Sequence, residues 1–157
     1  MSKGFLAAEN GHVVQLLAPR DVTAAATSDT FCMKNWAHAS IICGFGVGSS
    51  TTITLGECVG FGGTSRTAIS FRYAQEAAGG GDVLDAALVW ASSISIVGSV
   101  AALGGFAVIE IDADELSDGF QYVQVNLTDP GASKLAAMYA VLSGGRYQED
   151  ITATVIV

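Results

Sequence analysis

The fold class is indicated first by an eleven-residue stretch, AHASIICGFGV, which spans residues 37–47. Apolar side chains occupy every second position of this stretch, and only Ile42 breaks the alternation. A period of two predicts a β-strand with one face in a core and the other toward water or a partner. The predicted core face consists of Ala37, Ala39, Ile41, Cys43, Phe45 and Val47.

The same alternation recurs in shorter runs along the chain, at residues 53–61, 69–73, 107–111, 123–127 and 151–155. Turn-forming clusters rich in Gly, Ser and Asp separate many of these runs. Strands at such spacing are typical of sandwiches and barrels. We therefore predict an all-β, single-domain β-sandwich or barrel, jelly-roll-like, with about eight to ten short strands.

Two segments are compatible with either a short helix or a strand. Residues 82–90 and 133–142 are both rich in Ala and Leu, but alternation within 133–142 favours a strand there. The first 28 residues are less regular than the rest. We predict an irregular N-terminal arm at residues 1–28, with a possible short strand at 13–17, followed by a β-sandwich domain at 29–157.

Composition excludes several classes of protein. Of 157 residues, only 14% are charged, and 15 Asp and Glu outweigh seven Lys and Arg to give a net charge of −8. Low charge with high apolar content excludes intrinsic disorder, and the shortage of cations argues against nucleic-acid binding. No basic residue lies between Arg72 and Lys134, whereas nine acids do. This asymmetry favours an oriented protein with one docking side and one exposed side.

Neither a membrane span nor a secretion signal is expected. Residues 86–109 include 24 positions without a charge, but Ser and Gly interrupt them and no Lys or Arg flanks them. Glu9 occurs before any apolar run of signal-peptide length. The three cysteines, Cys32, Cys43 and Cys58, form no C-x-x-C motif, so we expect buried free thiols in a reducing compartment.

No motif predicts an enzyme, and we expect no cofactor. The two histidines, His12 and His38, lack a signature that marks a nucleophile, and no G-x-S-x-G or phosphate-binding glycine motif occurs. Residues 112–119 are similar to a calcium loop, but Leu116 stands where a ligand is required. We expect Asp112, Asp114 and Asp118 to be solvated, with a weak Ca²⁺ or Mg²⁺ site as the alternative.

Three stretches carry a family resemblance: FCMKNWAHA at residues 31–39, VIEIDADEL at 108–116 and LSGGRY at 142–147. Together with the short, Gly/Ala/Thr/Val-rich chain, they resemble small virion proteins of tailed bacteriophages of the capsid decoration (cement) type. The resemblance implies a jelly roll, often trimeric, that binds a major capsid protein. It also implies a location on the capsid surface of the virion after synthesis in the host cytoplasm.

The function expected from these observations is that of a non-enzymatic structural virion protein. It would bind the outer surface of the shell, bridge neighbouring major capsid subunits and so stabilise the capsid. One alternative is a carbohydrate-binding β-sandwich module, in which Trp36, Trp90 and Tyr147 would stack on sugars. The other alternative is a tail or connector protein of the virion.

The candidate binding residues lie in the predicted arm. Its apolar content suggests that a neighbouring protomer or the shell holds it in place, and a homotrimer is the favoured assembly. We also expect deletion of residues 2–17 to leave a folded domain that binds shells weakly. The candidate capsid- or protomer-binding residues are Phe5, Leu6, Val13, Leu16, Leu17 and Arg20.

Overall fold

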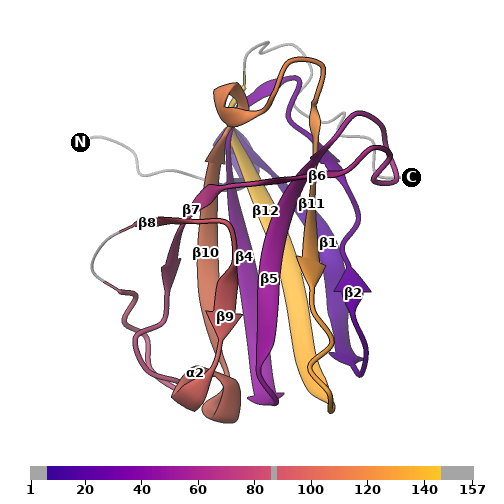
Figure 1. Cartoon of the computed structure of the whole chain (residues 1–157). Helices are drawn as coiled ribbons and strands as arrows, with labels where there is room; N and C mark the ends of the chain where they lie inside the picture. Colours follow the sequence, from indigo (N-terminus) through magenta and orange to yellow (C-terminus); the bar gives the residue numbers. More distant parts are fainter. Residues whose placement is uncertain (1–6, 86–87, 146–157) are drawn as a thin grey trace, which may run out of the picture.

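A computed structural model describes residues 7–85 and 88–145, which form two antiparallel sheets packed face to face (Figure 1). Sheet A has the strand order β1-β12-β4-β10-β7-β8. Sheet B has the order β2-β11-β5-β6, with β3 paired to β11 and β9 paired to β5. The prediction of an all-β, single-domain sandwich is confirmed.

The strands of sheet A include three of twelve or more residues, whereas most strands of sheet B are short. Sheet A contains β1 (Gly11–Val22), β4 (Trp36–Gly48), β7 (Phe71–Gln75), β8 (Val89–Ala91), β10 (Gly105–Asp112) and β12 (Lys134–Gly145). Sheet B contains β2 (Ala26–Thr27), β3 (Phe31–Cys32), β5 (Thr51–Cys58), β6 (Thr67–Ile69), β9 (Ile94–Ile96) and β11 (Tyr122–Leu127). The helical elements are α1 (Ala7–Asn10), α2 (Gly98–Leu103) and the 3-10 turn η1 (Ala113–Glu115).

The strands expected at residues 37–47, 107–111 and 123–127 are confirmed, as is the preference for a strand at 133–142. The run at 53–61 is shorter than expected, because β5 ends at Cys58. The run at 69–73 is split at Ser70, where the chain crosses from sheet B into sheet A. The strand expected at 151–155 lies outside the described residues.

One continuous core lies between the sheets and follows from the alternation. Ala39, Ile41 and Cys43 of β4 are fully buried, and they face Ile53 and Leu55 of β5 across the sandwich. Burying apolar surface stabilises the fold by roughly 25 cal/mol per Å². Cys43 and Cys58 are buried free thiols, as expected, whereas the free thiol Cys32 is only partly buried. Burial raises the pKa of Cys43 to about 12.

The predicted irregular arm needs correction, because residues 11–22 form β1 and pair with β12. Val14, Leu16, Leu17 and Val22 are buried in the core. Two register shifts, between Gln15 and Leu17 and between Leu17 and Arg20, interrupt the period of two. These irregularities hide the strand in the sequence, because a bulge brings neighbouring residues such as Leu16 and Leu17 to the same side.

The uncharged segment tested as a membrane span is divided among β8, β9, α2 and the start of β10. Within the described ranges, no helix is long and apolar enough to cross a membrane. Residues 82–85 and 88–90 contain no helix, whereas the sequence analysis missed α2 at Gly98–Leu103. Val100 and Ala101 of α2 are buried, and this short helix covers one end of the sandwich core (Figure 1).

Candidate functional site

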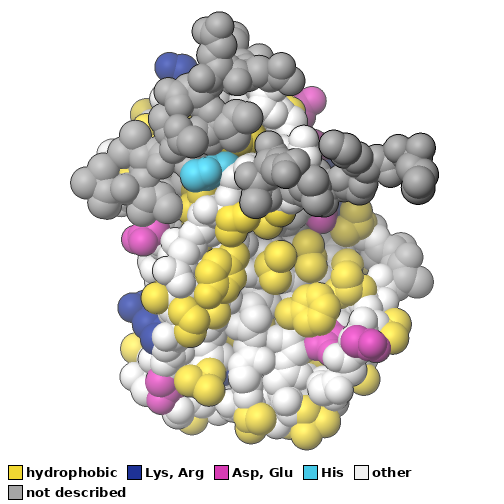
Figure 2. Space-filling view, turned by 180° about the vertical axis from the view of Figure 1, so that it is seen from behind, with side chains coloured by type: hydrophobic (Ala, Val, Ile, Leu, Met, Phe, Trp, Pro, Cys, Tyr) yellow, Lys and Arg dark blue, Asp and Glu magenta, His cyan; other side chains and the backbone are white. Residues whose placement is uncertain are grey.

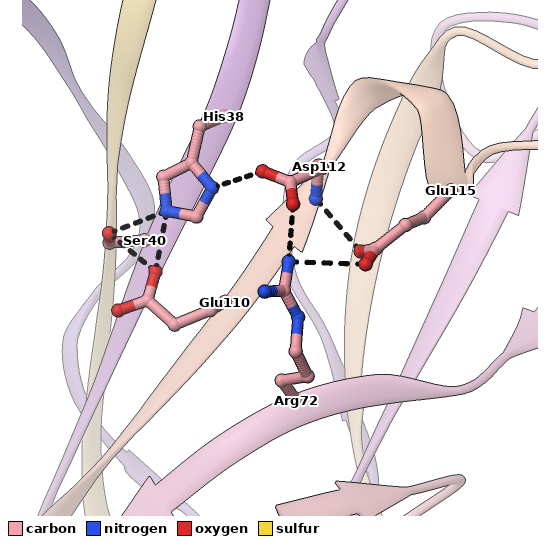
Figure 3. Close-up of polar contacts among 6 residues, drawn as sticks. All are labelled: His38, Ser40, Arg72, Glu110, Asp112 and Glu115. Carbon is pink, nitrogen blue, oxygen red and sulfur yellow. Dashed lines mark hydrogen bonds and ion pairs between the residues drawn. The ribbon is translucent and has the colours of Figure 1, made fainter. Parts of the chain in front are cut away.

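A cluster of polar side chains lies on the outer face of sheet A, where strand register brings together residues from four elements (Figure 3). β10 pairs with β4 on one side and with β7 on the other. Asp112 is therefore opposite His38, and Glu110 is opposite both Ser40 and Arg72. Glu115 of η1 completes the group, which we call the polar cluster.

His38 lies between two carboxylates. Its Nδ1 is 2.6 Å from Asp112 Oδ1, and its Nε2 is 2.8 Å from Glu110 Oε2. Arg72 donates to the other oxygen of Asp112 and also pairs with Glu115 at 3.1 Å. Glu115 in turn accepts the backbone N–H of Asp112 at 2.9 Å. The cluster is therefore an internally paired network of charges that ties β4, β7, β10 and η1 together.

The network shifts the pKa values of His38 and Asp112. Burial by itself lowers the pKa of His38, but the hydrogen bonds and charges of Asp112 and Glu110 outweigh it, and the pKa is raised above its usual value. The hydrogen bond from His38, aided by Arg72, lowers the pKa of Asp112 despite its partial burial. Both shifts favour an imidazolium held between carboxylates.

The order Asp112–His38–Ser40 is similar to a nucleophilic triad, but the proton positions do not suit one. Ser40 Oγ donates to Glu110 Oε2 at 2.6 Å, whereas its separation from His38 Nε2 is 3.4 Å. A triad requires a neutral imidazole that accepts the hydroxyl proton of the serine. Here Glu110 takes that hydrogen bond and also favours the protonated imidazole, so the geometry indicates structural pairing of β4 with β10.

The raised pKa of His38 makes the stability of the protein depend on pH. Its stabilising contribution should be fully present below the unfolded-state value of 6.5 and be lost as pH rises through the higher folded-state value. We expect the melting temperature of wild type to exceed that of His38→Gln most clearly near pH 6, and the gap to narrow toward pH 9. Thermal melts across this range provide the measurement, and a gap that widens with pH would contradict the network.

Residues 112–119, the segment that is similar to a calcium loop, make contacts within the protein. The expectation that Asp112 is simply solvated is wrong, because it is paired with His38 and Arg72. Asp114 and Asp118 are exposed, as expected. The backbone N–H of Ser117 donates to the buried carboxylate of Glu57 at 2.7 Å. Among the described residues, no group of three or more His, Cys, Asp or Glu side chains is arranged to hold a metal ion.

The sequence predicted one acidic surface and one surface that holds the cations. In the structure, the two basic residues that border the acidic span are paired or buried. Arg72, at the edge of the span without basic residues, neutralises part of the acidic group around Asp112. Lys134, at the other edge, is only 1% exposed. Its Nζ lies 5.5 Å from the ring centroid of Phe45 and has no hydrogen-bond partner among the described residues, and burial lowers its pKa. Neither cation therefore lies free on the surface.

Next to the polar cluster, the outer face of sheet A carries an apolar band, which we define as Val13, Ile42, Val108, Tyr139 and Val141. Cross-strand pairing places Val13 beside Val141, and Ile42 between Tyr139 and Val108. Val13 is 51% exposed and Ile42 is 39% exposed. Figure 2, seen from the side of sheet A, shows hydrophobic side chains gathered over the middle of this face.

The outer face of sheet B differs in character. The outward positions on β5 and β11 include Thr54, Gln124 and Asn126, of which Thr54 and Asn126 are partly exposed and Gln124 is buried at 8% exposure. Exposed apolar patches on a monomer mark interaction surfaces more often than isolated apolar residues do. The contrast between the two outer faces therefore makes sheet A the candidate docking side.

Farther along sheet A the face is hollowed by two adjoining depressions of about 320 Å³ and 570 Å³, which share Gly44 and Gly46 of β4. We call them together the trough. Leu135, Ala137 and Arg20 line one part of it, and Phe106, Leu103 and Glu76 line the other. The hollow exists because two outward positions of β4, Gly44 and Gly46, carry no side chain, and a Cβ on Gly44 would meet no atom nearer than 3.9 Å.

The candidate binding residues of the sequence analysis are only partly at this surface. Val13 belongs to the apolar band, and Arg20 lines the trough. Leu16 and Leu17 are buried in the core, at 1% and 6% exposure, so they cannot contact a partner. Phe5 and Leu6 lie outside the described residues. Of the aromatic candidates for sugar stacking, Trp36 is buried against His12, Trp90 is exposed, and Tyr147 lies outside the described residues.

The sequence did not reveal three features: the members of the apolar band on β10 and β12, the polar cluster as a unit, and the trough. No local motif marks them, because their residues meet only through pairing of strands that are distant in the sequence. The sequence feature that could have pointed to this surface is the set of outward-facing residues on each strand. On β4 this set includes Ile42, Gly44 and Gly46.

Comparison with known proteins gives one finding on the fold. The chain is similar to a solved structure, the SPBc2 prophage-derived protein YomS, with a TM-score of 0.51 and 10% sequence identity. The match covers 85% of this chain and 94% of that protein. No family model and no curated protein matches the sequence. At this identity the similarity shows a shared fold, a β-sandwich that extends over most of both chains.

Proposed function

We propose that this protein is a non-enzymatic structural component of a phage virion that decorates and stabilises the capsid. It binds the outer surface of the shell and bridges neighbouring major capsid subunits, so its location is the capsid surface. It acts as a homo-oligomer, with a trimer favoured. Its function requires no cofactor, no nucleic acid and no membrane. Two independent observations support a phage origin: the fold shared with a prophage-derived protein and the family resemblance of residues 31–39, 108–116 and 142–147.

The observation that carries the proposal is the apolar band on sheet A. Its five members are uncharged, in a protein with a net charge of −8, so it is a surface on which another protein can dock without separating charges from water. Sheet B, whose outer face is polar, would then face solvent. The exposed members of the apolar band support sheet A as the docking side, in place of Leu16 and Leu17, which are buried.

Binding to a repeated lattice explains how a plain surface of this kind can stabilise a shell. A ligand that binds only the assembled shell shifts the equilibrium toward assembly, by RT ln(1 + [L]/Kd) per site. Several copies joined in one oligomer raise the effective concentration of each remaining contact. Modest single contacts through the apolar band are therefore sufficient, and no strongly charged or catalytic site is required.

The test is co-sedimentation of the protein with undecorated capsids of the parent phage. Ile42→Glu places a charge in the centre of the apolar band, between Tyr139 and Val108, while Ile42 itself is exposed enough for the fold to tolerate the change. We expect at least about a tenfold loss of affinity, which corresponds to about 1.4 kcal/mol. The matched control is Val59→Glu, which also replaces an exposed apolar side chain by a carboxylate. Val59 is 47% exposed and follows β5 of sheet B.

Two results would contradict the proposal. If wild-type protein fails to sediment with capsids, the decoration function is wrong and a tail or connector role is favoured. The copy number of the protein per virus particle would then distinguish these roles. Equal loss of binding by Ile42→Glu and Val59→Glu would show that sheet A is not the docking side. Melting temperatures of both variants, measured alongside, show that each one is folded in the assay.

A further inference from the structure

We propose that pH regulates docking of this protein to the shell through the polar cluster: the proton on His38 favours docking, and its loss weakens docking. The inference rests on the proposed capsid decoration and concerns the regulation of the same surface. Two observations carry it, the contacts of the imidazole ring and the position of the cluster beside the apolar band.

Both ring nitrogens of His38 contact carboxylates (Figure 3). Nδ1 lies 2.6 Å from Asp112 Oδ1, and Nε2 lies 2.8 Å from Glu110 Oε2. An ionised carboxylate only accepts hydrogen bonds, and only the protonated imidazole donates from both of its nitrogens. In the neutral ring one nitrogen would turn a lone pair toward a carboxylate oxygen, so one of the two contacts has to open. The arrangement is complete only while the ring holds its second proton.

The other charged groups around His38 leave the cluster with an excess of negative charge. Arg72 on β7 pairs with Asp112 and with Glu115 of η1. On β12 the residue opposite His38 is Ser143, which does not titrate in this range. Two cations and three carboxylates leave one uncompensated negative charge while His38 is protonated. Loss of the proton raises this excess to two.

The polar cluster is continuous with the apolar band. On β10, Val108 of the band lies two residues from Glu110 on the same face, so their Cα atoms are about 7 Å apart. Ser40, which donates to Glu110, pairs with Val141 of the band on β12. A protein that docks on Ile42 and its neighbours therefore covers or borders Glu110.

Docking on this surface removes water from the cluster. The side chains of His38, Glu110 and Asp112 keep 30%, 21% and 38% of their accessible surface in the free protein. When water is removed, opposite charges attract more strongly and an uncompensated carboxylate becomes more costly. The cluster with one excess negative charge is therefore easier to cover than the cluster with two. By linkage, docking must hold the proton on His38 more tightly.

The pH range of the effect follows from the free protein. Burial opposes the charged form of His38, but the hydrogen bonds and charges of Asp112 and Glu110 outweigh it, and its pKa is raised above 6.5. A group with a raised pKa is protonated below that value and loses its proton as the pH rises through it. Docking should therefore be tightest near pH 6 and weaken toward pH 9.

The test measures co-sedimentation with undecorated capsids of the parent phage at pH 6 and pH 9. Wild-type affinity is expected to be at least tenfold higher at pH 6. His38→Gln is uncharged at both values, so it should bind like wild type at pH 9 and change less than twofold between them. The matched control is His12→Gln, which replaces a histidine that stacks on Trp36 instead of joining the cluster, and it should keep the wild-type ratio.

Proton uptake provides a second readout. Calorimetry of docking near pH 8, in buffers of different ionisation enthalpy, should show more protons taken up per bound copy by wild type than by His38→Gln. Circular dichroism at each pH verifies that every variant is folded in the assay. Equal pH ratios or equal proton uptake for wild type and His38→Gln, or docking that tightens toward pH 9, would overturn the inference and leave capsid decoration intact. Absence of wild-type binding at both values would overturn both.

Discussion

Deletion of residues 2–17 is expected to give a chain that does not fold. The deletion removes the first half of β1, including Val14, Leu16 and Leu17, which are buried at 1% to 6% exposure. Each such side chain contributes about 1.5–3 kcal/mol by its burial, and the whole domain has only about 5–15 kcal/mol of stability. The deletion also leaves residues 138–143 of β12 without their partner strand in sheet A.

The matched variant is the shorter deletion of residues 2–6, which ends before the first described residue. It should keep the circular dichroism spectrum of a β-protein and a cooperative thermal transition, whereas the longer deletion should lose both. A folded, cooperative protein after removal of residues 2–17 would show that β1 is dispensable. It would restore the interpretation of the N-terminus as an arm separate from the sandwich.

Phe71→Ala is expected to destabilise the sandwich core strongly. Phe71 is fully buried, packs edge-on against Tyr73 with ring centroids 6.4 Å apart, and follows the crossing between the sheets at Ser70. Replacing a buried Phe by Ala costs about 3–5 kcal/mol through lost transfer energy and the cavity that remains. Urea denaturation should show this loss in the free energy of unfolding.

Phe61→Ala provides the control for the same chemical change. Phe61 also packs edge-on against a tyrosine, Tyr122, with ring centroids 6.5 Å apart, but it is 41% exposed and lies outside the strands. Its replacement should lower the free energy of unfolding by less than half as much as Phe71→Ala does. Similar losses for the two variants would indicate that the crossing at Ser70 does not position Phe71 in the core.

The sandwich could be predicted because its central strands obey a simple period. The central part of β4 alternates from Ala39 to Phe45, and Ala39, Ile41 and Cys43 all lie in the core as the pattern indicates. Val47 was expected on the same face but is 66% exposed. It lies near the end of β4, beyond Phe45, the last buried side chain of the strand, and alternation alone does not reveal where a core ends.

Local irregularity hid two other elements. The shifts in register at Leu17 and Arg20 break the period of β1, so a twelve-residue strand was interpreted as an arm with a short strand. α2 was missed because six residues of Gly, Ser, Val, Ala and Leu carry too little pattern to distinguish a helix from a strand or loop. In both cases tertiary packing, through Leu16 or Val100, determines the structure.

The candidate site depends almost entirely on long-range pairing. His38 and Asp112 are 74 positions apart in the sequence, and Arg72 and Asp112 are 40 apart, yet register on β10 brings all three together. The trough likewise requires Gly44 of β4, Leu135 of β12 and Glu76 after β7. Without the strand order no sequence pattern predicts these neighbours, although the outward glycines of β4 were visible from the start.

The measurement that tests the central claim most directly is a cryo-electron microscopy reconstruction of undecorated capsids of the parent phage after incubation with the purified protein. The proposal predicts added density on the outer surface of the shell, into which the sandwich fits with the apolar band of sheet A toward the capsid subunits and sheet B toward solvent. Density confined to the portal or tail, no added density, or a sandwich whose sheet B faces the shell would contradict it.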